Sequence, residues 1–252
     1  MKSFVNKYWK TLLFFVVMGL VGGFCVGLFS LESYPPAIRE EILSQGMTPV
    51  ILAVVSAVQA AGYGLVLGAA GILMAKKVGI WKDETEFQKK PLAAAVIVAV
   101  IGGLAMIGLD IFFFGRFSQP IMDSYLVKPS MAFVLGSVTY GAVIEEVMLR
   151  LFMMTLIALV LHLVFERKRE TASVWVLVTA NIISALLFAA GHLPATQMML
   201  GLSPMILARC FLLNGGIGLM FGWLYRKYGL RYAMVAHGGC HIVSKAIWIL
   251  FL

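Results

Sequence analysis

Charged side chains are scarce in this chain of 252 residues: Asp, Glu, Lys and Arg make up only 13% of it. Soluble domains carry about a quarter. Hydrophobic residues instead make up 61%, and the mean hydropathy is +0.95. A soluble protein of this length could not bury so much apolar surface, so the composition predicts a polytopic membrane protein. The apolar runs are long and continuous, which favours an all-α transmembrane helical bundle over a β-barrel.

Cysteine is also rare. Its three copies, Cys25, Cys210 and Cys240, are scattered through apolar segments without a CxxC pair, so no disulfide framework is expected. A cleavable signal peptide is not evident, because the first apolar run is long enough to span and lacks a small-x-small cleavage site. We therefore expect a retained first helix. No internal repeat is apparent, so an inverted-repeat transporter has no positive support.

The hydropathy pattern predicts seven membrane spans. The fourth would reach about 54 Å as one straight helix, well beyond a hydrocarbon core of ~30 Å. It must tilt, protrude or break, and it could hide an eighth span. A short interfacial helix is expected near Arg39, between the first two spans. The predicted spans are 11–31, 49–75, 91–114, 130–165, 173–191, 204–225 and 232–252.

The net charge of +8 does not indicate nucleic-acid binding. The basic residues lie in short clusters beside apolar runs, with no basic groove interleaved with aromatics. These clusters all fall on one side of the predicted bundle. The positive-inside rule then places the N-terminus in the cytoplasm and the C-terminus outside. The clusters are the N-terminal residues, 76–90, 166–170 and 226–231.

Two adjacent carboxylates and an arginine interrupt one of the most apolar stretches, as Glu145, Glu146 and Arg150. Charge at membrane depth costs roughly 2.5–3.5 kcal/mol per group on insertion scales, so function is its default interpretation. Glu146 and Arg150 are i,i+4 neighbours in the favourable order, and a bidentate pair is expected. Glu145 then lies about 100° around the helix, free to act as a general base. The structural alternative is an ion-pair network that fixes helix packing.

Three histidines lie within or near the ends of spans. His237 and His241 share one face of the seventh span at i,i+4 spacing, and Phe188 and His192 have the same spacing on the fifth. Pro194 is expected to end the fifth helix near His192. A single membrane histidine usually serves packing. Three of them alongside a buried acidic pair indicate a site.

The predicted spans place these groups at different depths. Glu145 lies mid-membrane, His237 lies toward the cytoplasmic side and His192 lies toward the outside. They converge only if the fifth span starts deeper, if 192–203 re-enters the membrane, or if the fourth helix is broken.

Other polar groups in apolar surroundings are expected to have structural roles. Arg209 can snorkel to the nearer surface, and Lys245 needs a partner, for which Asp110 is a candidate. Glycines in the last two spans allow helices to approach closely. The groups assigned to structure are Asp110, Asn181, Arg209, Asn214 and Lys245, with His162 expected at the interface.

Three ordered motifs together resemble the CPBP family of intramembrane proteases, which includes the type II CAAX prenyl proteases and bacteriocin-processing or immunity-type proteins. They are Glu145-Glu146-x-x-x-Arg150, Phe188-x-x-x-His192 and His237-x-x-x-His241. The resemblance covers about 130–245. It implies that 130–252 is a catalytic transmembrane core and that 1–129 supplies the first three helices.

The resemblance also implies roles for these residues. Glu145 would activate a water with His192 as its partner, and His237 would stabilise the oxyanion. The groups that orient the site would be Glu146, Arg150 and Phe188.

One departure concerns the third motif, which usually ends in Asn or Asp and here ends in His241. Imidazole can still donate a hydrogen bond, and it adds a possible zinc ligand. Zinc would be held by Glu145, His192, His237 and His241. No HExxH motif settles the question, and a metal-free, glutamate-activated water is slightly favoured.

We therefore expect a multi-pass protein of a bacterial plasma membrane, in contact with lipid, that hydrolyses a peptide bond of a membrane-associated substrate. A prenylated CAAX C-terminus, a leader and a bacteriocin precursor all remain open as substrates. One alternative is a non-proteolytic binding or immunity protein of the same fold. The other is a proton-coupled transporter, because buried Glu and His also suit proton relays.

Overall fold

The computed structural model describes residues 2–83 and 86–252, and this part of the chain is helical without a strand. The predicted all-α bundle is confirmed. Seven helical stretches are long and apolar enough to cross a membrane. No eighth appears among the described residues, so the fourth stretch crosses once. The seven are Ser3–Ser30, Pro49–Lys77, Lys89–Arg116, Met131–Phe165, Val174–Leu200, Pro204–Tyr228 and Leu230–Phe251.

Several spans are built from more than one helical segment. The first three are α1 (Lys2–Ser30), α3 (Pro49–Lys77) and α4 (Lys89–Phe112), which a 3₁₀ turn, η1 (Phe114–Arg116), follows. The fourth comprises α6 (Met131–Gly136), η2 (Ser137–Glu145), η3 (Val147–Met154) and α7 (Thr155–Phe165). The fifth joins α8 (Val174–Gly191) to α9 (Leu193–Leu200). The last two are α10 (Pro204–Cys210), η4 (Phe211–Gly216) and α11 (Ile217–Tyr228), then α12 (Leu230–Phe251).

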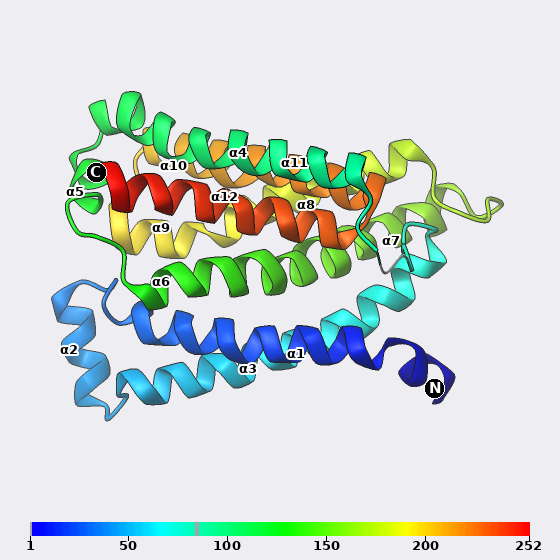
Figure 1. Ribbon diagram of the computed structural model, residues 1–252, viewed down its shortest axis with the longest axis horizontal. Helices are drawn as coiled ribbons and strands as arrows, with labels where there is room; N and C mark the ends of the chain where they lie inside the picture. Colours follow the sequence, from blue (N-terminus) through cyan, green and yellow to red (C-terminus); the bar gives the residue numbers. More distant parts are fainter. Residues whose placement is uncertain (1, 84–85) are drawn as a thin grey trace.

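The spans run along the long axis of the molecule, with the two termini at opposite ends (Figure 1). One end, which we term the α2 end, holds α2 (Pro36–Ser44), α5 (Gln119–Ser124) and the C-terminus. The other, which we term the basic end, holds the N-terminus and the loop after α7. The helix expected near Arg39 is α2.

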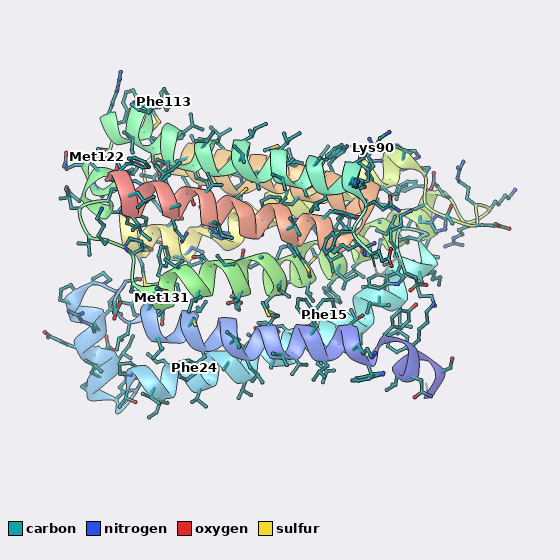
Figure 2. The ribbon with its side chains drawn as sticks, in the orientation of Figure 1. Phe15, Phe24, Lys90, Phe113, Met122 and Met131 are labelled. Atoms are coloured by element: carbon teal, nitrogen blue, oxygen red, sulfur yellow. The ribbon has the colours of Figure 1, made fainter. Side chains whose placement is uncertain are left out.

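The outer surface of the bundle is apolar. Phe24, Phe113 and Met131 project from it, with exposed fractions of 39%, 47% and 71% (Figure 2). Exposed patches of this kind mark surfaces that meet another apolar phase. Together with the seven apolar helices, they identify an integral membrane protein.

The fourth span does break from α-helical geometry, as its length suggested. Segments η2 and η3 are π-helical, with the acidic pair at their junction. Wider π turns of this kind are rare and are found mostly at functional sites. The change re-aims the side chains of Glu145 and Glu146 relative to a regular α-helix.

The predicted helix end near His192 is confirmed, because α8 ends at Gly191, but the apolar stretch continues beyond it. The chain turns at His192 with φ −84° and ψ −11°, and continues as α9 to Leu200. Pro194 lies in the first turn of α9, where a missing N–H costs no helical hydrogen bond. His192 therefore lies at a junction within the span rather than at its end, which removes the predicted conflict of depth.

Helices α1 and α3 pack through a seam of small residues that the sequence analysis did not single out. Gly19, Gly23 and Gly27 follow one another at i,i+4 spacing on α1. A Cβ added at Gly27 would lie 2.5 Å from Ala53 Cα, and one at Gly19 would lie 2.7 Å from the Ala60 carbonyl. Small residues let membrane helices meet backbone to backbone, so this seam fixes the α1–α3 pair.

Replacing Gly23 by Leu should destabilise the protein, because a Cβ there would meet the Ser56 carbonyl and lie 2.8 Å from Ala57 Cα. Overpacking of this kind costs about 1–3 kcal/mol. The matched control is Gly62→Leu on α3, where a Cβ has no neighbour within 4 Å. Thermal unfolding in detergent should show a lower Tm for the Gly23 variant only. Equal Tm values for the two variants would contradict the close packing.

Candidate active site

The three motifs converge on one cavity of about 370 Å³. Glu145 reaches it from η2, Phe188 and His192 come from the fifth span, and His237 and His241 come from α12. A cavity therefore lies between spans 4, 5 and 7. The sixth span also contributes, through Asn214 and Phe221, as do α1 and α4. Phe221 carried no signal in the sequence, because an apolar residue in an apolar span looks like packing.

Glu146 is buried at the centre of a three-part contact. Its Oε1 lies 3.2 Å from Arg150 Nη1 and accepts a hydrogen bond of 2.9 Å from His237 Nδ1. The predicted pairing of Glu146 with Arg150 is confirmed, but the bidentate geometry is wrong. Arg150 Nη1 and Glu146 Oε2 have no hydrogen-bond partner among the described residues. The histidine from α12 shares the oxygen that a bidentate pair would use.

Arg150 is fully enclosed by apolar surroundings and backbone. Its guanidinium carbon lies 4.5 Å from the Phe188 ring centre and 5.5 Å from that of Phe221. Its Nη2 donates a 2.9 Å hydrogen bond to the Gly218 carbonyl. Aromatic faces and a carbonyl can accommodate a buried cation, so Arg150 joins the fourth span to the fifth and sixth.

Glu145 has a different environment from its neighbour. Its side chain is 22% exposed, whereas that of Glu146 is 0% exposed. Glu145 Oε2 lies 3.8 Å from His237 Nε2, and the carboxylate accepts no hydrogen bond from the rest of the described chain. Glu146 is therefore held by two close contacts, whereas Glu145 has only the 3.8 Å approach of His237.

The partners of the histidine rings define their orientation. His192 Nδ1 donates to the Phe188 carbonyl at 2.8 Å, and its ring meets the Phe188 ring edge to face at 4.7 Å. The His237 ring stacks on Phe221 at 4.5 Å and 19°. With each Nδ1 tied to a neighbour, each Nε2 is the nitrogen left to act in the cavity.

His241 lies beside His237, with ring centres 5.0 Å apart. Both rings approach the backbone of η2 at Gly141. A Cβ added there would lie 3.1 Å from His241 Nε2 and 3.6 Å from His237 Nε2. Glycine at this position keeps the two ring nitrogens uncovered.

The predicted partner of Lys245 is wrong. Asp110 instead forms a bidentate pair with Arg209, with both contacts at 2.5 Å. Arg209 therefore pairs inside the bundle and does not snorkel. Tyr125 donates a 2.7 Å hydrogen bond to the same carboxylate. Burial and the Asp110 charge raise the pKa of Tyr125, so its phenol keeps the proton that it donates.

Other structural assignments hold. Asn181 donates to the Leu219 carbonyl at 3.0 Å, and Asn214 donates to the Cys210 carbonyl at 3.0 Å. His162 is 5% exposed and lies 3.5 Å from Glu166 in the last turn of α7, so it is buried in the bundle near the basic end. All three cysteines are free.

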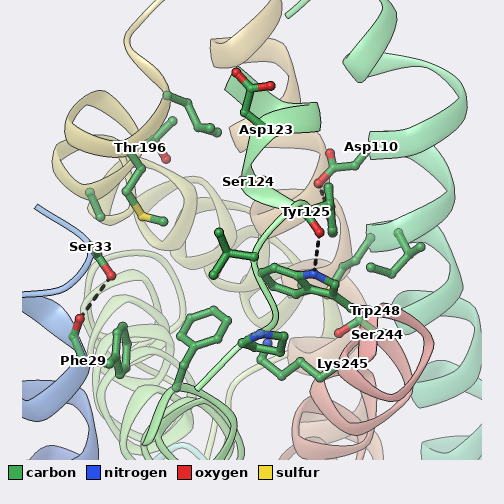
Figure 3. A pocket seen from close by; sticks show the side chains of 18 of the residues that line it. Phe29, Ser33, Asp110, Asp123, Ser124, Tyr125, Thr196, Ser244, Lys245 and Trp248 are labelled. Carbon is green, nitrogen blue, oxygen red and sulfur yellow. Dashed lines mark hydrogen bonds between the residues drawn. The ribbon is translucent and has the colours of Figure 1, made fainter. Parts of the chain in front are cut away.

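A second chamber of about 540 Å³ adjoins the first. His192, Asn214 and Lys245 line both, so the two chambers share a wall. Figure 3 shows Tyr125, Lys245 and Trp248 around the second chamber. Its outermost residues come from the loop after α1, from α5 and from the end of α9, which are all at the α2 end. The second chamber therefore extends from the motif cavity toward that end of the molecule.

A zinc centre would need several of the predicted donors around one point. Across 2–83 and 86–252, no three His, Cys, Asp or Glu side chains are grouped so as to hold a metal ion. The side chains as arranged do not form a zinc centre, and whether the protein uses zinc stays a prediction.

Part of the chain that contains this site matches a known protein family. Residues 127–243 match the family described as type II CAAX prenyl endopeptidase Rce1-like. The match includes all three motifs. Neither the curated proteins nor the solved structures contain a match to the chain. The match confirms the resemblance to the CPBP family over residues 127–243, which hold the converging motifs.

Proposed function

We propose that this protein is an intramembrane endopeptidase that hydrolyses a peptide bond of a membrane-associated substrate with a glutamate-activated water. The observation that supports it most directly is the contrast between the two adjacent carboxylates. Glu146 is tied to Arg150 and His237, whereas Glu145 faces a cavity lined by three imidazoles. A tied carboxylate orients the site, and an untied one can take up a proton.

The reaction begins when Glu145 accepts a proton from water. The resulting hydroxide attacks the carbonyl carbon of the scissile bond, and the carbonyl oxygen becomes an oxyanion. His192 and His237 each tie Nδ1 to a neighbour, so Nε2 can hold the water against Glu145. Glu145 then passes its proton to the leaving amine as the carbon–nitrogen bond breaks.

The oxyanion needs a donor on the other side of the carbonyl. His241 is the remaining imidazole, and its Nε2 lies close to the backbone of Gly141, which also lines the cavity. Sequence reasoning gave the oxyanion to His237. The hydrogen bond from His237 to Glu146 makes His241 the better candidate, with His237 next to the water.

Glu145→Gln should abolish cleavage, because the amide cannot accept the proton from water. We expect a loss of roughly 10²–10⁴-fold or more, the usual share of a general base. Purified wild type and variant would be incubated with a labelled membrane proteome, and new termini would be counted. Glu41→Gln on the exposed helix α2 is the control for the same chemical change and should cleave normally.

Full activity of the Glu145 variant would rule out this mechanism. No cleavage by wild type would favour the non-proteolytic alternative.

Removal of metal should leave activity unchanged if the water is activated by Glu145 alone. Wild-type protein would be dialysed against EDTA and 1,10-phenanthroline and assayed on the substrates found above. A loss of activity that Zn²⁺ restores would instead support the zinc alternative.

We also propose that the N-terminus is cytoplasmic. Lysines and arginines gather at the basic end, whereas the loops of the α2 end carry few. The second chamber then opens on the non-cytoplasmic side, so substrate would reach Glu145 from there.

The orientation can be tested with single cysteines and a membrane-impermeant maleimide on intact cells. Asp123→Cys on α5 should react, because it lies at the α2 end. Lys168→Cys, in the exposed loop after α7, should react only after permeabilisation. The reverse pattern would place the N-terminus outside.

A further inference from the structure

Lys245 is a buried amine that the reaction as described does not use. It is 6% exposed, lies on the last span and lines both chambers. Asp110, its predicted partner, is taken by Arg209 and Tyr125. In the described part of the chain, Lys245 forms no ion pair with a carboxylate. Burying an amine at membrane depth costs free energy, so Lys245 is expected to have a function.

Two contacts hold the amine in place. Its Nζ lies 4.6 Å from the centre of the Phe133 ring, a cation–π distance. It also lies 3.3 Å from His241 Nδ1, one helical turn earlier on α12. The spacing is i,i+4, so the two side chains share a face of the helix.

The second contact determines where the imidazole proton resides. With Lys245 as an ammonium, which carries three donors and no acceptor, His241 Nδ1 is the acceptor. A neutral ring whose Nδ1 accepts carries its proton on Nε2. That nitrogen is the one that faces Gly141 and the cavity.

The other two rings have the opposite arrangement. His192 Nδ1 faces a backbone carbonyl and His237 Nδ1 faces a carboxylate, and neither partner can donate. Both rings therefore carry the proton on Nδ1 and present a lone pair at Nε2. Among the three, His241 alone presents an N–H to the cavity in its neutral form.

We propose that Lys245 is a positioning residue that fixes the tautomer of His241, so that the Nε2–H points at the oxyanion. The assignment also accounts for the departure in the third motif. An Asn amide at this position carries its own N–H donors, whereas an imidazole needs a partner to set its proton. The catalytic part of the proposal rests on the proposed function; the tautomer does not.

The tautomer can be measured without any assay of cleavage. Protein labelled with ¹⁵N-histidine and carrying no histidine tag would be examined by two-dimensional ¹H–¹⁵N NMR in micelles. The signals lost in His241→Asn identify His241 in the wild-type spectrum. We expect the Nε2–H pattern for His241 and the Nδ1–H pattern for His192 and His237. A wild-type His241 with its proton on Nδ1, or on both nitrogens, would overturn the proposal, and this measurement needs no change at Lys245.

The catalytic part is tested by a double-mutant cycle. Lys245→Met removes the donor and keeps most of the apolar volume. We expect it to lower kcat by roughly 10²-fold in the wild-type background, the usual cost of an oxyanion donor, with KM little changed. In the His241→Asn background, the same substitution should leave kcat unchanged, because an amide needs no lysine.

An equal loss of kcat in both backgrounds would refute the positioning role and show that Lys245 acts elsewhere. Gel filtration and Tm would exclude unfolding of the variants. Absence of cleavage by wild type would count against the proposed function alone, since the NMR result decides the tautomer independently.

Discussion

The buried carboxylate of Glu146 is the contact on which the rest of the site depends. One oxygen is shared by a guanidinium from its own helix and an imidazole from the last span, 91 residues away. Either partner alone would leave a charge or a polar ring unsatisfied in an apolar interior, where such groups are costly. Because the contact ties the fourth span to the seventh, it also fixes the distance between Glu145 and the histidines.

The different environments of Glu145 and Glu146 follow from the geometry of the helix backbone. Adjacent residues on any helix point in different directions, and the π-helical turns at Ser137–Glu145 place this difference at the acidic pair. The inner carboxylate meets the buried cation and the outer one meets the cavity. Two identical side chains thus lie in different environments, one fully buried and one facing the cavity.

The features that could be predicted from the sequence are those that depend on the pattern of neighbouring residues. Seven spans, a short helix near Arg39 and the i,i+4 faces follow from hydropathy and periodicity, which act over a few residues. The failures involve partners far apart in the chain. Arg209 pairs with Asp110, which lies 99 residues earlier in the chain. The sequence around neither residue indicates this pairing. The end of α8 at Gly191 was predicted, whereas the continuation of the span as α9 was not, because a proline can also begin a helix.

The walls of the cavity come from two parts of the chain. Val26 and Phe29 of α1 and Met106 of α4 line it, although all three lie outside the region that matches the family. The motif residues and part of the cavity wall are therefore encoded in separate parts of the chain. If the proposed function holds, substitutions in the first and third spans would change the shape of the cavity while the motifs stay the same.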